Sequence, residues 1–172
     1  PIAVPWGAGD RAEYAIEANG AALGSLVFTT QRRDDGHVIT TETTVGAVRD
    51  VSSVRVDREL RPIGATRQVT GAGKADFALM SVYDKGKLTI QAKTADGDKA
   101  ATINVPSDAW DNDQCLVSIR ALPLADGYTY RYTNVVGASA TAVKTTVTVL
   151  GQEKIDVPAG SFTTYKVELD FG

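Results

Sequence analysis

The sequence predicts a mainly β protein, in which a strongly curved antiparallel sheet of about 10–12 strands forms an open half-barrel with one short helix on its concave side. Apolar and polar residues alternate along most of the 172 residues, as expected for strands with one buried face. Turn residues interrupt this alternation roughly every 8–12 positions, which is typical of antiparallel folds. A sheet this wide exposes too much apolar surface if flat, so we expect it to curve around the helix.

The first part of the chain is predicted to form consecutive hairpins. Asn19-Gly20 is the strongest turn signal, because a type I′ turn needs positive φ at both central residues. Asp34-Asp35-Gly36 and Lys85-Gly86 are further expected turns, and Arg61-Pro62-Ile63-Gly64 is expected to break the chain between two strands. The predicted strands are centred on Tyr14–Ala18, Leu26–Phe28, Val38–Val45, Val54–Val56, Ala65–Thr70, Phe77–Tyr83, Leu88–Ala92 and Ala101–Val105.

The pattern changes after Pro106. Apolar residues fall at positions 115, 116, 119 and 122, which is helical spacing and predicts a helix over 113–122. Asn112 or Asp113 is expected to cap it, because a short side-chain oxygen can accept an unpaired backbone N–H there. Beyond it we expect a strand through Tyr128–Tyr132, a loop over 134–140, a long strand over 143–149, a bend at 151, a short strand at 155–157 and a last strand over 162–171.

Composition is that of an ordinary globular chain, with 43% hydrophobic and 23% charged residues. We expect one domain over residues 1–172, and a targeting or anchoring segment could have been removed from either end. The net charge is −3 and no basic stripe is present, which argues against nucleic acid as a partner. One Cys and one His argue against a zinc site, and no apolar run is long enough for a transmembrane helix. No cofactor is implied, and a protein partner cannot be named.

Aromatic residues are the first candidates for a site. Tyr128, Tyr130 and Tyr132 alternate on one strand face, and Trp110 is nearby in the sequence. Such residues can line a pocket for an apolar or sugar ligand, although three tyrosines on one face can equally pack across strands. Arg120, near the end of the predicted helix, could pair with an acidic ligand or complement the helix dipole.

Other polar residues suggest chemistry less clearly. Asp108, Asp111 and Asp113 could bind Ca²⁺ or supply an acid/base pair, although their spacing lacks the glycine and the distal Glu of a calcium loop. A polar loop that caps the next helix explains them as well. Cys115 lies on the apolar helix stripe and is expected in the core, since His37 is its sole candidate basic partner. The segment Gly71-Ala72-Gly73-Lys74 resembles part of a phosphate loop, but it lacks the upstream glycine and is interpreted as a hairpin turn.

Two stretches carry a family resemblance, Ile119-Arg120-Ala121-Leu122-Pro123-Leu124 followed by Gly127, and residues 151–168 with the segment Val157-Pro158-Ala159-Gly160. With Leu23-Gly24, they make the chain resemble a family of bacterial envelope proteins of uncharacterised function, similar in fold to LolA/LolB-type lipoprotein carriers. The resemblance implies an extracytoplasmic setting (periplasmic, secreted or surface-anchored), no enzyme activity and, by analogy of fold, a ligand with acyl chains.

The sequence therefore leads to three hypotheses about function. The first is a non-enzymatic envelope protein that binds an apolar or amphipathic ligand, such as a lipid, between the sheet and the helix. Its expected ligand-binding residues are Trp110, Arg120, Tyr128, Tyr130 and Tyr132. The second is a structural or protein-interaction domain with a filled core, and the third is an enzyme that uses the three carboxylates on a glycan.

Overall fold

The alternating pattern produces two mainly antiparallel sheets in the computed structural model, which describes residues 4–71 and 76–172. Eight strands follow one another as a meander, so that each is hydrogen-bonded to the next along the chain. These strands are β1 (Gly9–Ala18), β2 (Ala21–Arg33), β3 (Gly36–Val45), β4 (Val48–Asp57), β5 (Pro62–Thr70), β6 (Phe77–Asp84), β7 (Lys87–Thr94) and β8 (Gly97–Asn104). β1 and β8 end the strand order without pairing to each other, so the predicted open antiparallel sheet is confirmed.

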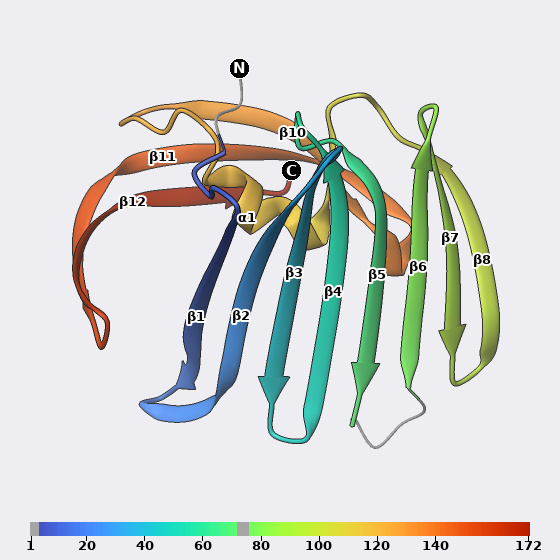
Figure 1. The fold of residues 1–172 in the computed structure, drawn as a ribbon, viewed down its shortest axis with the longest axis horizontal. Coiled ribbons are helices and arrows are strands. Elements are labelled where there is room, and N and C mark those ends of the chain that lie inside the picture. The colour runs from blue at the N-terminus through green and yellow to red at the C-terminus, as the bar shows by residue number, and fades with distance from the viewer. Residues whose placement is uncertain (1–3, 72–75) are drawn as a thin grey trace.

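A smaller sheet crosses one end of the larger one (Figure 1), in the strand order β12-β11-β10-β9. β9 pairs with β10 in parallel, whereas the other pairs are antiparallel. The elements of this half are β9 (Ala109–Asp111), the 3₁₀ turn η1 (Asn112–Gln114), helix α1 (Cys115–Ile119), β10 (Thr129–Val136), the 3₁₀ turn η2 (Gly137–Ser139), β11 (Thr141–Val157) and β12 (Gly160–Asp170). None of the helices in the described ranges is long and apolar enough to cross a membrane.

Hairpin geometry follows the turn signals in the sequence. Asn19 and Gly20 have φ of 52° and 77°, and Lys85 and Gly86 have φ of 47° and 75°. Both pairs thus have the positive φ at both central residues that a type I′ turn requires. The turn expected at 71–74 lies largely outside the described residues, which resume at 76.

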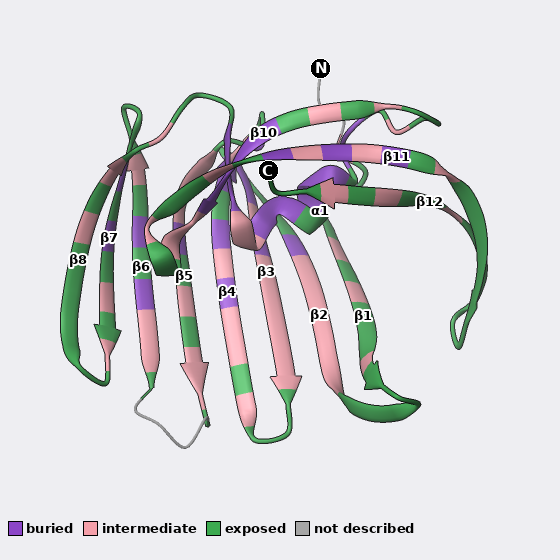
Figure 2. Cartoon of the chain, turned by 180° about the vertical axis from the view of Figure 1, so that it is seen from behind, coloured by how far each residue is buried: buried purple, intermediate pink, exposed green. Residues whose placement is uncertain are grey.

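Buried residues gather where the helix and the small sheet cover the large sheet. Buried residues lie toward the covered ends of β3 and β4, whereas those of β6 lie in the middle of the strand (Figure 2). One cluster joins Ile39 and Val54 of the large sheet to Val117 of α1, and all three are at most 1% exposed. A second cluster joins Trp110 to Cys115 and Tyr132 beneath the small sheet. The helix therefore does fill the concave side at this end.

Several local expectations were wrong. The predicted helix over 113–122 is a 3₁₀ turn followed by only five α-helical residues, and its cap is Asp111 rather than Asn112 or Asp113, because Asp111 is the last extended residue. β10 continues to Val136 through much of the loop expected over 134–140.

The break expected at residues 61–64 occurs slightly earlier, in the turn before Pro62, and the bend expected at Gly151 lies within a strand. Pro62 is the first residue of β5, a position that needs no N–H donor. The bend at Gly151 is a bulge inside β11, so Ile155 and Val157 continue that strand instead of forming a separate short one.

Gly24 in β2 offers a direct test of the sheet. A Cβ atom at this position would lie 1.8 Å from the carbonyl oxygen of Thr44 on β3, so Gly24→Ala must displace the backbone. We expect a loss of at least about 2 kcal/mol in the free energy of unfolding, measured by urea denaturation. Gly7→Ala is the control, because a Cβ there would meet no atom within 4 Å. Equal stability of the two variants would contradict this packing.

Candidate binding site

The aromatic residues that alternate along β10 stack on one another and on β9. The Trp110 ring centroid lies 5.3 Å from that of Tyr130 and 4.7 Å from that of Tyr132. The parallel register places Trp110 opposite Asn134, which brings β9 alongside the aromatic face of β10. Tyr132 and Trp110 are buried at 0% and 3% exposure, while Tyr128 and Tyr130 are half-buried. The cluster therefore has a closed floor and two accessible tyrosines.

An open recess of about 590 Å³ lies beside this cluster. We call it the aromatic recess. Its apolar wall comes from the small sheet and the segment after α1, and its charged wall comes largely from the turn between β4 and β5. The lining residues are Trp110, Leu122, Pro123, Tyr128 and Tyr130 on the apolar wall, Arg58, Glu59 and Arg61 on the charged wall, and Ser107, Asp108 and Ala109, which precede Trp110 in the chain.

The charged wall is held by a tight turn at residues 57–61. The Asp57 carboxylate accepts the backbone N–H groups of Glu59 and Arg61 at 2.8 and 2.9 Å, and the backbone N–H of Leu60 donates to the carbonyl oxygen of Asp57. An Asp side chain stabilises a turn by such local bonds. The side chains of Arg58 and Arg61 are thus presented from a defined backbone.

Gln114 connects this turn to the helical segment. Its side chain is 0% exposed, and its amide group donates to the carbonyl oxygen of Leu60 at 2.8 Å and to the Ser118 hydroxyl at 3.2 Å. Leu60 itself has φ of 61° and is fully buried in the core. A non-glycine residue keeps a left-handed conformation only where its surroundings fix it, so the side chain and the carbonyl group of Leu60 both anchor the turn.

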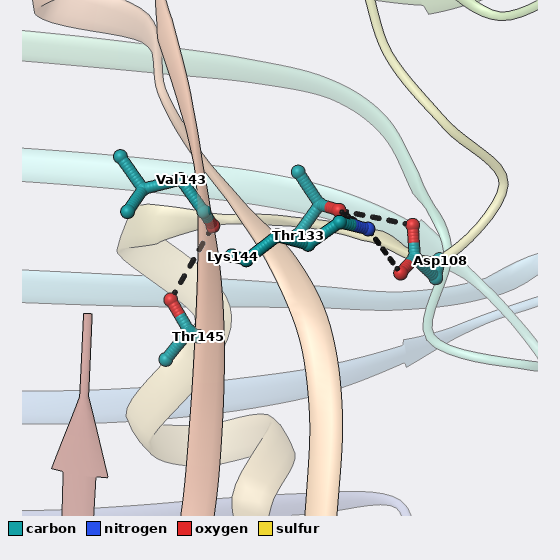
Figure 3. Close-up of polar contacts among 5 residues, drawn as sticks. All are labelled: Asp108, Thr133, Val143, Lys144 and Thr145. Carbon is teal, nitrogen blue, oxygen red and sulfur yellow. Dashed lines mark hydrogen bonds and ion pairs between the residues drawn. The ribbon is translucent and has the colours of Figure 1, made fainter. Parts of the chain in front are cut away.

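Asp108 at the rim belongs to a three-residue network, drawn in Figure 3. The Thr133 hydroxyl donates to one carboxylate oxygen at 3.0 Å, and the Lys144 ammonium donates to the other at 3.0 Å and to Thr133 at 2.8 Å. Burial acts to raise the pKa of Asp108, but the bonds from Lys144 and Thr133 outweigh it and hold the pKa below its usual range. Asp108 is therefore an ionised rim group that is already engaged.

The other two carboxylates do not share this recess. Asp111 is buried and caps η1, and its second oxygen accepts the Tyr83 hydroxyl at 2.7 Å. Burial raises the pKa of Asp111 to about 6 despite this bond. Asp111 and Asp113 border a gap of only about 10 Å³, which has room for one water molecule at most. The arrangement fits a capping segment better than a glycan-cleaving pair.

Arg120 lies apart from the aromatic recess. Its guanidinium donates to Asp10 of β1 at 2.8 Å and lies 5.9 Å from the centroid of the Trp6 ring. It therefore ties the end of α1 to the first strand. The structure brings together Trp110, Tyr128, Tyr130 and Tyr132, and adds Arg58 and Arg61, which no pattern in the sequence singled out.

Cys115 and His37 belong to different core clusters. Cys115 packs with Trp110 and Tyr132, and burial raises the pKa of its thiol. The His37 ring contacts Trp6, with centroids 6.0 Å apart. A buried thiol with a raised pKa is a poor nucleophile, which agrees with the expected core role of Cys115.

The fold and the recess define an open, two-sheet antiparallel β protein with an aromatic-walled surface recess. Residues 13–172 match a family model described as a protein of unknown function (DUF3108). The chain belongs to this family, because the match covers nearly all of it. No curated protein matches the chain, and neither does any solved structure.

The raised pKa of Asp111 predicts a pH-dependent stability. The pKa is about 6 in the folded protein against an ordinary 3.8, so between these values the folded state holds the proton more firmly. Raising the pH from about 4 to about 6 should therefore lower the free energy of unfolding, by roughly 2 kcal/mol from this group. Asp111→Asn keeps an acceptor for the Asp113 amide but cannot ionise, so its stability should fall less over this range. Urea denaturation across the range measures the difference, and parallel pH profiles of the two proteins would contradict the assignment.

Proposed function

We propose that this protein binds an amphipathic small ligand in the aromatic recess and is not an enzyme. The observation that carries the proposal is the pairing of an accessible aromatic wall, Tyr128 and Tyr130, with a wall that carries Arg58 and Arg61. The volume of about 590 Å³ lies within the roughly 300–1,000 Å³ of small-molecule sites. An apolar portion would pack on the tyrosines, and a polar or anionic group would face the arginines.

Desolvation supplies the main driving force in this proposal. Half-buried tyrosine rings lose little conformational freedom when a ligand covers them, and they offer large apolar area with a polar end. Arg61 contacts Glu59 within the turn, whereas Arg58 donates to a backbone carbonyl group. Arg58 is therefore the better candidate to meet an anionic ligand group.

The location differs from the one expected between the large sheet and the helix. That space is occupied by Ile39, Val54 and Val117, which are all at most 1% exposed. A ligand there would have to displace packed side chains, at a cost of several kcal/mol. The recess lies beside this core and needs no such displacement.

The resemblance to LolA/LolB-type carriers adds two parts to the proposal. It favours an acyl chain as the apolar portion of the ligand, and it favours an extracytoplasmic setting in a bacterial envelope. Both rest on the sequence motifs at residues 119–127 and 151–168 and on the fold that this resemblance implies, and neither depends on the geometry of the recess.

A protein-interaction role is the second candidate, and the hairpin of β11 and β12 favours it. Beyond the Gly151 bulge this hairpin exposes large apolar side chains, among them Ile155 at 36%, Val157 at 43% and Phe162 at 46%. Ile155 and Phe162 are directly opposed in the register, so they form one apolar surface. Exposed apolar surface of this kind often marks an interaction site.

The test uses dodecanoate, which joins an acyl chain to a carboxylate. Isothermal titration should detect saturable binding to the wild-type protein. The variant Tyr128→Ala/Tyr130→Ala should bind about tenfold more weakly, which corresponds to about 1.4 kcal/mol. Tyr14→Ala/Tyr165→Ala removes two exposed tyrosines elsewhere and should bind like the wild type. Equal affinity of both variants, or no binding at all, would reject the recess as the site.

A further inference from the structure

A second hollow, of about 490 Å³, lies where the β2–β3 hairpin meets the β4–β5 turn. Its lining residues are Ala8, Arg32, Arg33, Asp34 and Arg58. We call it the arginine hollow. Three arginines line this hollow, in a protein whose net charge is −3. The hollow is therefore locally positive, although the whole chain has a negative net charge. The guanidinium of Arg33 also donates to the side-chain oxygen of Gln31 at 2.8 Å.

The backbone brings these arginines together through a close approach at Gly36. A Cβ atom on Gly36 would lie 2.0 Å from the carbonyl oxygen of Val56, so a side chain would push the β2–β3 hairpin away from β4. Two further contacts complete the site. Arg58 donates to the carbonyl oxygen of Asp34 at 2.9 Å, and the backbone N–H of Arg32 donates to the carbonyl oxygen of Ala8 at 3.1 Å.

Most of the neighbouring carboxylates are already engaged. Arg55 pairs with Asp35 at 3.0 Å, and Arg61 pairs with Glu59. Among residues 4–71 and 76–172, no ion pair joins Arg32, Arg33 or Arg58 to a carboxylate. Asp34 is the one acidic residue in the lining, so three positive charges face one negative charge and leave an excess of about two.

The pKa of the neighbouring His37 is affected by the charge of this cluster. Arg32 lies opposite it in the β2–β3 register. Burial, and secondly the charge of Arg32, lower the pKa of the imidazole. His37 is thus neutral at neutral pH and leaves the charge of the hollow to its arginines.

We propose that the arginine hollow binds a phosphate-type oxyanion. Guanidinium groups donate in a planar fork that matches phosphate oxygens, and such charge-assisted bonds are strong. A phosphate monoester or diester would neutralise the excess charge. The proposal rests on this hollow alone and does not require the aromatic recess, although Arg58 borders both cavities. A single ligand could therefore place a phosphate group in the arginine hollow and an apolar group in the aromatic recess, on either side of Arg58.

The first test is a titration with inorganic phosphate, followed by NMR of the backbone amides and the arginine Nε–H groups. We expect saturable shifts at Arg32, Arg33 and Arg58. Arg32→Gln/Arg33→Gln, which leaves the lining of the aromatic recess intact, should weaken binding at least about tenfold. Lys87→Gln/Arg131→Gln removes the same charge from exposed positions elsewhere and should change it less than about twofold. Shifts that do not saturate, or equal losses in both variants, would overturn the proposal.

The second test separates a lipid headgroup from a free phosphate compound. Vesicles of phosphatidylcholine are compared with vesicles that also contain phosphatidic acid, and bound protein is sedimented. Binding that needs phosphatidic acid, Arg32 and Arg33 supports a headgroup, whereas phosphate binding without vesicle binding supports a free compound. Dodecanoate binding by the Arg32→Gln/Arg33→Gln variant tests the recess separately, so failure of one proposal leaves the other distinguishable.

Discussion

The buried amide of Gln114 is the contact on which the two layers depend. It donates to the carbonyl oxygen of Leu60 in the β4–β5 turn and to the Ser118 hydroxyl of α1, and it accepts the Asp111 amide at the end of β9. A fully buried side chain amide must satisfy its hydrogen-bonding groups within the protein. Its position therefore fixes where the β4–β5 turn, the helix and the small sheet meet.

The geometry of both candidate sites depends on this junction around Gln114. The β4–β5 turn carries Arg58 to the border between the aromatic recess and the arginine hollow. The buried side chain of Leu60 anchors the turn in the core, and the Asp57 carboxylate accepts backbone N–H groups of the turn. The aromatic wall is fixed from the other direction, because Trp110 immediately precedes the Asp111–Gln114 capping box. A few core residues, among them Leu60 and Gln114, thus position the side chains that line both candidate sites.

Most of the strand pattern could be predicted from the sequence, because strands such as β4 and β7 bury alternate residues and the apolar alternation shows this directly. The same alternation placed Tyr128, Tyr130 and Tyr132 on one face. It could not place Arg58 beside them, since nothing local in a sequence specifies which distant turn lies over which sheet. Nor could it place Arg120 outside the recess, because its partner, Asp10, is 110 positions away. The helix was overestimated because Leu122, although buried, belongs to the turn that follows α1.

The most direct test of this account is amide hydrogen exchange in Gln114→Leu, compared with Gln91→Leu at an exposed position of β7. Loss of the bond to Leu60 should cost about 1–3 kcal/mol and speed the exchange of the Glu59, Leu60 and Arg61 amides more than that of the β7 amides. This comparison separates local opening of the turn from a general loss of stability. Unchanged relative protection of the turn would show that Gln114 does not hold it, and the account of both sites would then fail.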